Sequence, residues 1–151
     1  MDLRRIEEEM SRGRQLEDIL EGYDWKDFEN ICSQIFQEHG WKTENNFRFK
    51  SENRYEIDIV ARKGSKVLCA DCKHWGIRPG KKTQLRYAAE KQKERTEQLS
   101  RTTLLGSGKE TAFHPMVITL MQEDIYQSED VWIVPVFRLN DFLLNYERYL
   151  D

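Results

Sequence analysis

Residues 56–73 read EIDIVARKGSKVLCADCK, two short apolar runs joined by a turn at Gly64 and Ser65. Short apolar runs bounded by turn residues are typical of buried β-strands. If the turn is centred between Gly64 and Ser65, Asp58 lies directly opposite Asp71, with Cβ atoms about 4.5–5.5 Å apart. Lys73 shares the face of Asp71 because strand residues two apart point the same way. The hairpin therefore brings two carboxylates and an ammonium group together.

Charged groups on a mostly apolar hairpin need a physical reason, because buried charges must be paired or must bind a metal ion. Carboxylate oxygens are the ligands that Mg²⁺ prefers in proteins. The simplest functional interpretation of Asp58, Asp71 and Lys73 is a divalent-metal site with a lysine beside it. A purely structural salt-bridge cluster of the same three residues is the alternative.

The composition indicates one soluble globular domain. The chain has 151 residues, of which 34% are charged and 38% hydrophobic, without low-complexity runs. No apolar stretch reaches the ~20 residues of a membrane span, and the charged N-terminus is unlike a signal peptide, so we expect a cytoplasmic protein. The cysteines are expected to be reduced. Cys69 and Cys72 would point to opposite faces of a strand and could not share a zinc ion.

Positive charge is concentrated in one part of the chain, although the net charge is −3. Residues 73–109 hold ten Lys and Arg against three Glu, whereas residues 1–39 and 110–151 are acidic. Nucleic-acid binding requires Lys and Arg on one surface rather than a basic overall pI, so the net charge does not exclude a polyanionic substrate. A helix charged only for solubility explains the same block equally well.

Periodicity predicts the element order α-α-β-β-β-α-β-β-α. Residues 1–22 are expected to form an N-terminal helical appendage, softened near Gly13, and residues 23–151 a single domain. An antiparallel meander followed by a helix and further strands predicts an α/β fold with a mixed central sheet and helices on both faces. The expected helices are 3–20, 25–39, 82–101 and 139–149, and the expected strands are 41–50, 56–61, 67–73, 113–121 and 131–137.

Two polar side chains fall within or beside apolar helix faces. The helix at 25–39 has Asp24 as its N-cap and Gly40 as its stop, and its apolar arc runs from Trp25 to Phe36. Glu29 lies at the margin of that arc, so its carboxylate is expected at or just above the core. On the helix at 82–101, Gln92 lies within a narrow apolar stripe.

This set of residues resembles the PD-(D/E)xK nuclease superfamily, which has the restriction-endonuclease-like fold. The resemblance covers roughly residues 24–137 and rests on Glu29, on Asp58, and on Asp71-Cys72-Lys73 as the (D/E)xK triplet. Within the superfamily, the chain is similar to Mrr-like restriction endonucleases and archaeal Holliday-junction resolvases. The chain departs from the pattern in having Ile57 where a proline often stands, and an aspartate at 71 in place of the commoner glutamate.

The resemblance implies a catalytic set of Glu29, Asp58, Asp71 and Lys73 that uses Mg²⁺ or Mn²⁺ and no organic cofactor. Asp58, Asp71 and the backbone carbonyl of Cys72 would hold the metal. Glu29 would hold a second metal or orient the metal's waters. Lys73 would position the attacking water or neutralise charge on the phosphate.

Three further side chains are candidate auxiliary members of the site. Glu56 shares the face of Asp58, although exposure to solvent or pairing with Arg54 or Lys73 is the favoured interpretation. Gln84 and Gln92 are alternatives for the glutamine that some relatives carry on the helix after the triplet, and the residues do not decide between them.

The implied function is a Mg²⁺-dependent endonuclease that cuts duplex or branched DNA, either restriction-like or junction-resolving. A homodimer is expected, because cutting two strands needs two active sites. The alternative is a nuclease-fold module that binds nucleic acid or a protein partner without cutting. The presence of every ligand and of the lysine favours the enzyme. The residues expected to contact DNA phosphates are His74, Arg78, Lys81, Lys82 and Arg86.

Overall fold

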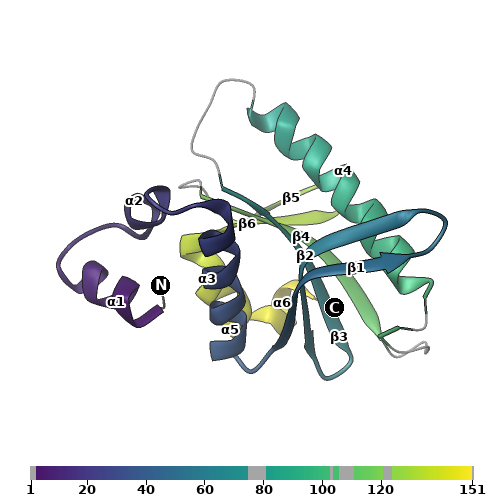
Figure 1. Cartoon of the computed structure of the whole chain (residues 1–151), viewed down its shortest axis with the longest axis horizontal. Coiled ribbons are helices and arrows are strands. Elements are labelled where there is room, and N and C mark those ends of the chain that lie inside the picture. Colours follow the sequence, from purple (N-terminus) through teal and green to yellow (C-terminus); the bar gives the residue numbers. More distant parts are fainter. Residues whose placement is uncertain (1–2, 75–80, 103, 106–110, 121–123, 151) are drawn as a thin grey trace.

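A six-stranded mixed β-sheet forms the centre of the computed structural model, with helices on both of its faces (Figure 1). The structure describes residues 3–74, 81–102, 104–105, 111–120 and 124–150. The strands are β1 (Lys42–Lys50), β2 (Arg54–Lys63), β3 (Lys66–Lys73), β4 (Ala112–Thr119), β5 (Tyr126–Ser128) and β6 (Val131–Pro135), and their order in the sheet is β1-β2-β3-β4-β6-β5. The helices are α1 (Leu3–Ser11), α2 (Leu16–Glu21), α3 (Trp25–Glu38), α4 (Lys81–Ser100), α5 (Leu139–Leu144) and α6 (Tyr146–Tyr149), with a 3₁₀ turn η1 (Val136–Arg138).

The first three strands form the predicted antiparallel meander. β2 and β3 pair from the turn as far as Ile59 opposite Ala70, in the register predicted from the turn residues. The paired positions end there. Asp58 and Asp71 are the next residues of their strands, so they lie where β2 and β3 begin to separate.

β2 changes face at Asp58. The residue opposite Asp58 on β1 is Asn46, whose φ of 53° interrupts the regular strand. Ile57 packs in an apolar cluster with Leu99 of α4, whereas Ile59 packs in the cluster that contains α3. Strict alternation would place both isoleucines on one face. Because of this distortion, the side chains of β2 do not alternate regularly between the two faces of the sheet at Asp58.

The second half of the sheet is mainly parallel. β3 pairs with β4, and β4 pairs with β6, both in parallel, while α4 lies between β3 and β4 in the chain. β5 is a short antiparallel edge strand that the sequence did not predict. The carboxyl end of β3 thus carries Asp71 and Lys73 immediately before the chain leaves the sheet, at the edge where open α/β sheets commonly bind ligands.

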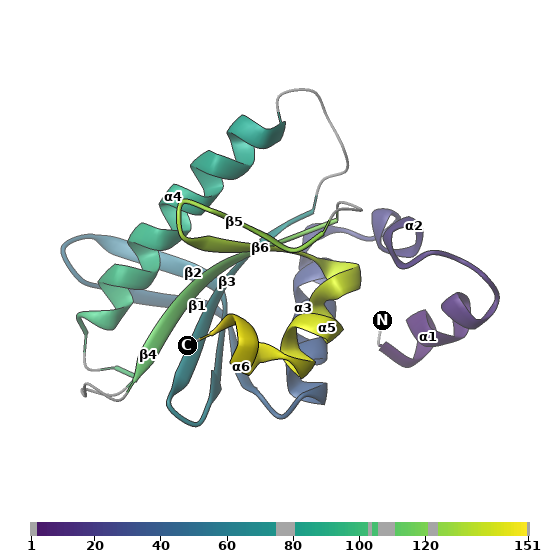
Figure 2. The ribbon, with the colours of Figure 1, turned by 180° about the vertical axis from the view of Figure 1, so that it is seen from behind.

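The two faces of the sheet are covered by different helices. α3 and α5 cover one face, and α4 crosses the other (Figures 1 and 2). The predicted apolar stripe of α4 is confirmed, with Gln92 buried inside it. The buried side chains of that stripe are Leu85, Ala88, Ala89, Thr96 and Leu99. Within the described residues, no helix is long and apolar enough to cross a membrane.

The helices differ from the prediction in three details. Trp25 was predicted to face the core but is 54% exposed, because it begins α3 before the helix reaches the sheet. The N-terminal helix is interrupted at Gly13, whose φ is 91°, and the closing helix is interrupted at Asn145. Both N-terminal helices pack on the main core, to which they contribute Ile6, Ile19 and Leu20.

Candidate active site

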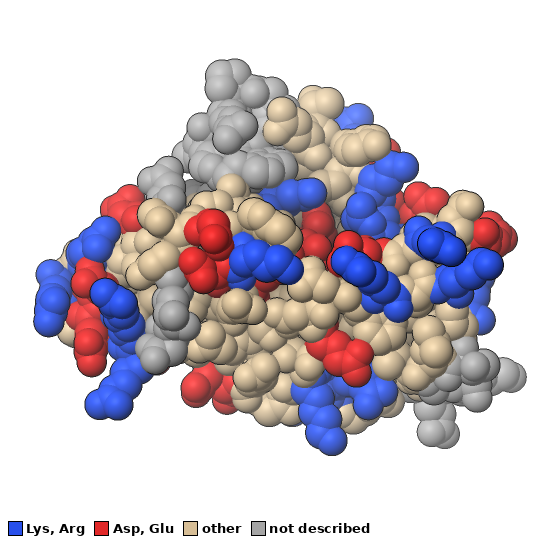
Figure 3. Space-filling model, in the orientation of Figure 1, with Lys and Arg blue, Asp and Glu red and all other residues tan. Residues whose placement is uncertain are grey.

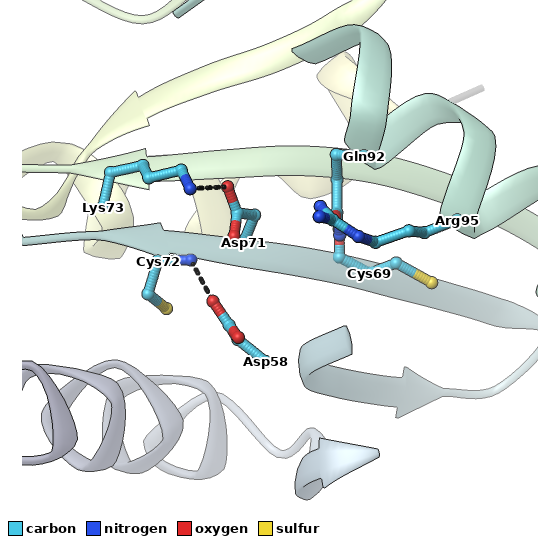
Figure 4. A network of polar contacts seen from close by, with 7 residues as sticks. All are labelled: Asp58, Cys69, Asp71, Cys72, Lys73, Gln92 and Arg95. Atoms are coloured by element: carbon cyan, nitrogen blue, oxygen red, sulfur yellow. Dashed lines mark hydrogen bonds and ion pairs between the residues drawn. The ribbon is translucent and has the colours of Figure 1, made fainter. Parts of the chain in front are cut away.

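Asp58 reaches across the opening between β2 and β3. Its Oδ2 accepts a hydrogen bond from the backbone amide of Cys72, 2.9 Å away (Figure 4). Asp71 precedes Cys72 on β3 and is 7% exposed. Its carboxyl group also lies close enough to that of Asp58 for its negative charge to raise the pKa of Asp58.

Glu29 brings a third carboxyl group to the same place from α3. Its side chain is 2% exposed, and its carboxyl group lies close enough to those of Asp58, Glu56 and Asp71 for them to affect its pKa. Its Oε2 has no hydrogen-bond partner among the described residues. The N-terminus of α3 is held by the predicted cap, in which Asp24 Oδ1 accepts from the amide of Asp27 at 2.9 Å. Acidic side chains from α3, β2 and β3 therefore lie near one another.

The acids disfavour one another's charge. Burial, followed by the negative charge of Asp71, raises the pKa of Asp58 to about 7, although the hydrogen bond from Cys72 opposes the shift. Burial also raises the pKa of Glu29, and the charges of Glu56 and Asp71 act in the same direction. Without a cation, Asp58 is therefore expected to gain a proton as pH falls through neutrality.

Lys73 places its ammonium group beside Asp71. Its Nζ lies 3.3 Å from Asp71 Oδ2 (Figure 4). This contact is an ion pair rather than a well-directed hydrogen bond, since Asp71 Oδ2 lacks a hydrogen-bond partner among the described residues. Figure 3 shows acidic side chains in the middle of this face of the molecule, bordered by Lys and Arg side chains.

The donor set fits a divalent cation. The pKa values of Asp58 and Glu29 are raised by burial and by the negative charge of Asp71, and buried oxygens of Glu29 and Asp71 lack hydrogen bonds among the described residues. A positive ion would stabilise such a set, and oxygen donors suit Mg²⁺ or Mn²⁺. Within the described part of the chain, no three acidic, thiol or imidazole groups converge closely enough to hold an ion by themselves. Mg²⁺ usually keeps several waters and takes one or two carboxylates, so an open set of this kind is sufficient.

The thiols near the site are poor metal ligands. Burial raises the pKa of Cys69 to about 12. A hydrogen bond with Cys32, together with burial, raises the pKa of Cys72 well above its usual range. Cys69 packs in the cluster on the α4 side and Cys72 against the cluster on the α3 side, so they face opposite ways as predicted. All three cysteines are free.

The two glutamines of α4 occupy different environments. Gln92 is 0% exposed; its Nε2 donates to the carbonyl of Cys69 at 2.8 Å, and its Oε1 accepts from Arg95 Nη1 at 3.1 Å (Figure 4). It therefore ties α4 to β3 two residues before Asp71. Gln84 is exposed and lines a surface pocket with Lys73.

Two other candidates have partners outside the carboxylate set. Glu56 is exposed and pairs with Arg48, whose Nε lies 3.4 Å from Oε1, rather than with either cation considered from the sequence. His74 donates from Nε2 to the carbonyl of Leu20 at 2.9 Å, and its ring centroid is 5.5 Å from that of Phe28. That bond connects the end of β3 to α2.

The candidate phosphate-binding cations are only partly described. Lys82 and Arg86 are exposed on α4, and Arg86 Nε lies 3.8 Å from Glu129 Oε1. Arg78 and the side chain of Lys81 lie outside the described residues. The DNA contacts predicted for these residues remain predictions.

A set of side chains beside Lys73 was missed in the sequence. Tyr87, Lys91 and Arg95 line a pocket of about 470 Å³ together with Lys73, Thr83, Gln84 and Ala88. These α4 residues follow one another at intervals of three and four, the spacing of a single helix face. That spacing shows in the sequence that these residues share one face of the helix. Only the fold shows that this face lies beside Lys73.

Comparisons with known proteins relate this chain to nucleases. A family model for the Mrr catalytic domain, described as a restriction endonuclease, matches residues 20–99. An uncharacterized protein from Archaeoglobus fulgidus is 36% identical over 127 residues, which cover 83% of this chain and 94% of that protein.

Two crystal structures are weakly similar. The structure of AF1548, a protein of unknown function, has a TM-score of 0.40 and 19% identity over 64% of this chain and 47% of its own. Protein VC1899 from Vibrio cholerae has a TM-score of 0.42 and 13% identity over 81% of this chain and 33% of its own. The chain thus spans about half of one solved protein and a third of the other.

Proposed function

The chain belongs to the restriction endonuclease family of the Mrr catalytic domain, and from that membership we propose that it is a divalent-metal-dependent endonuclease that hydrolyses phosphodiester bonds of DNA. We assign the catalytic roles to Glu29, Asp58, Asp71 and Lys73. The supporting observation is that two buried carboxyl groups, Glu29 and Asp71, and the half-buried Asp58 lie near Lys73, where β2 and β3 separate.

Asp58 and Asp71 would hold the cation through their carboxylate oxygens, together with the backbone carbonyl of Cys72. When bound, Mg²⁺ or Mn²⁺ supplies Lewis acidity and lowers the pKa of its bound water. Glu29 would accept hydrogen bonds from the ion's waters through the oxygen that lacks a partner. The bound ion would also offset the negative charge of the three carboxylates.

Lys73 would act on the phosphate and on the attacking water. Its ammonium group is half-buried and lies beside Asp71, so it can donate to a phosphate oxygen where negative charge develops during hydrolysis. A compact ammonium group with three donors can reorient between the carboxylate and the phosphate without leaving the site. Lys73 is therefore the residue whose loss should affect chemistry more than metal binding.

The substrate is proposed to be DNA, duplex or branched. The cations Lys82 and Arg86 are exposed on α4 and line a surface pocket with β5, and they would make sequence-independent phosphate contacts. A homodimer would supply the second active site needed to cut the second strand. The rival function is a module that binds DNA or a protein without cutting.

A cleavage panel separates these functions. The purified protein is incubated with supercoiled plasmid, linear duplex, modified duplex and four-way junction DNA, in Mg²⁺, in Mn²⁺ and in EDTA. We expect nicking or cutting of at least one substrate in metal and none in EDTA. Retained DNA binding with no cleavage in either metal would support the binding module instead.

A further inference from the structure

The pocket beside Lys73 combines an exposed aromatic ring with several cations. Tyr87 is 62% exposed on α4, an unusual environment for a large aromatic side chain. The pocket measures about 470 Å³, within the roughly 300–1,000 Å³ of typical small-ligand sites. Lys73 belongs to both the pocket and the carboxylate set, so the pocket begins where the proposed reaction takes place.

The cations of the pocket are arranged around the tyrosine ring. Lys91 Nζ lies 5.6 Å from the centroid of the Tyr87 ring, close enough for a cation–π contact that steadies the ring. Arg95 is half-buried, and its contact with Gln92 Oε1 uses one of its five N–H donors. A phosphate entering the pocket would therefore meet Lys73, Lys91 and the remaining donors of Arg95.

This combination suits one part of a nucleic acid. A base in continuous duplex is stacked on both faces and offers no free ring surface, so only an unpaired base can stack on an exposed aromatic side chain. The phosphates on either side of that base are anionic and complement the cations of the pocket. A plain duplex would use the cations but not the ring.

We propose that this pocket binds an unpaired nucleotide next to the phosphate that is cut, with its base stacked on Tyr87 and its phosphates on Lys91 and Arg95. The proposal rests on the proposed endonuclease function and adds the substrate class to it: DNA with an unpaired nucleotide beside the cleavage point, such as a branch, flap or gap. Tyr87 is then the residue that determines the preference for DNA with an unpaired nucleotide.

The test measures binding rather than cleavage. A duplex and the same duplex with a three-nucleotide flap carrying the fluorescent base 2-aminopurine are titrated in EDTA and low salt. The full-length wild type, Tyr87→Phe, Tyr87→Ala and the distant exposed control Leu144→Ala are compared, with circular dichroism to check folding. We expect the wild type, Tyr87→Phe and Leu144→Ala to prefer the flap by roughly 5- to 100-fold and to quench the fluorescent base.

Tyr87→Ala should lose most of that preference and the quenching while binding plain duplex as the wild type does. Equal preference in Tyr87→Ala and the wild type, no preference in the wild type, or no binding of either DNA would overturn the proposal. Because the measurement contains no metal, its result is independent of cleavage. A failed cleavage panel with intact flap preference would refute the nuclease function and leave the nucleotide pocket standing.

Discussion

The carboxylate of Asp58 on β2 accepts a hydrogen bond from the backbone amide of Cys72 on β3, across the point where the two strands separate (Figure 4). This bond orients one oxygen of the carboxylate. It does not neutralise the group, which remains surrounded by Glu29 and Asp71. The structural consequence is a site whose charge depends strongly on pH.

Asp58→Asn should stabilise the metal-free protein increasingly as pH rises. The pKa of Asp58 in the folded protein is about 7, well above the ~3.9 of an unfolded chain. A raised pKa of an acid contributes stability that is complete below about pH 4 and is lost as pH rises toward 7. Measured by urea unfolding in EDTA, the variant should gain up to about 4 kcal/mol on the wild type between pH 4 and pH 8. A difference that does not change with pH would contradict this account of Asp58.

Mn²⁺ or Mg²⁺ should raise the melting temperature of the wild type. A ligand that binds only the folded state at 100 times its Kd stabilises it by about 2.7 kcal/mol. Glu29→Gln should reduce the shift, because it removes an acceptor for the ion's waters. Glu56→Gln is the matched control, since Glu56 is exposed and paired with Arg48, and it should keep most of the shift. Equal shifts in all three proteins would show that the ion binds elsewhere.

Gln92→Leu should destabilise the fold, whereas Gln84→Leu should not. The first change leaves the Cys69 carbonyl and an Arg95 donor without their partner, which costs roughly 1–3 kcal/mol. The second change is at an exposed position and should stay within about 0.5 kcal/mol of the wild type. Denaturant unfolding of both variants measures the difference. Similar values for the two would mean that the buried glutamine does not hold α4 to β3.

Lys82→Ala and Arg86→Ala should weaken DNA binding and its salt dependence. Each lost phosphate contact lowers the slope of log K against log salt by about 0.9 on duplex DNA. Arg148→Ala, an exposed change on α6, is the control and should leave the slope unchanged. If both α4 variants have the same slope as the wild type, Lys82 and Arg86 do not contact DNA phosphates.

Local signals in the sequence predicted much of the fold correctly. The Gly64-Ser65 turn determined the register of β2 and β3, because a tight turn leaves few choices of pairing. Asp24 and Gly40 marked the ends of α3, since caps act through neighbouring backbone groups. Helical periodicity placed Gln92 within an apolar stripe, where it is buried, and placed Glu29 at the margin of an apolar arc, whereas the structure buries Glu29 to 2% exposure.

The remaining features depend on long-range packing. Nothing local marks Asn46 as the residue whose positive φ makes β2 change face at Asp58. Trp25 belongs to an apolar arc, but its exposure depends on where α3 meets the sheet. β5 has only three residues and can be recognised as a strand only from its pairing with β6. The pocket around Tyr87 exists because α4 lies beside the end of β3.

Lys73→Met removes the ammonium group and keeps the length of the side chain, so it tests directly whether Lys73 takes part in phosphodiester hydrolysis. Cleavage rates are measured in Mn²⁺ on the best substrate of the wild type, beside thermal shifts with the same ion. We expect cleavage to fall by roughly 100-fold or more, with the metal-induced thermal shift retained. Cleavage at the wild-type rate by Lys73→Met would show that Lys73 has no part in the reaction and that the chemistry takes place elsewhere in the molecule.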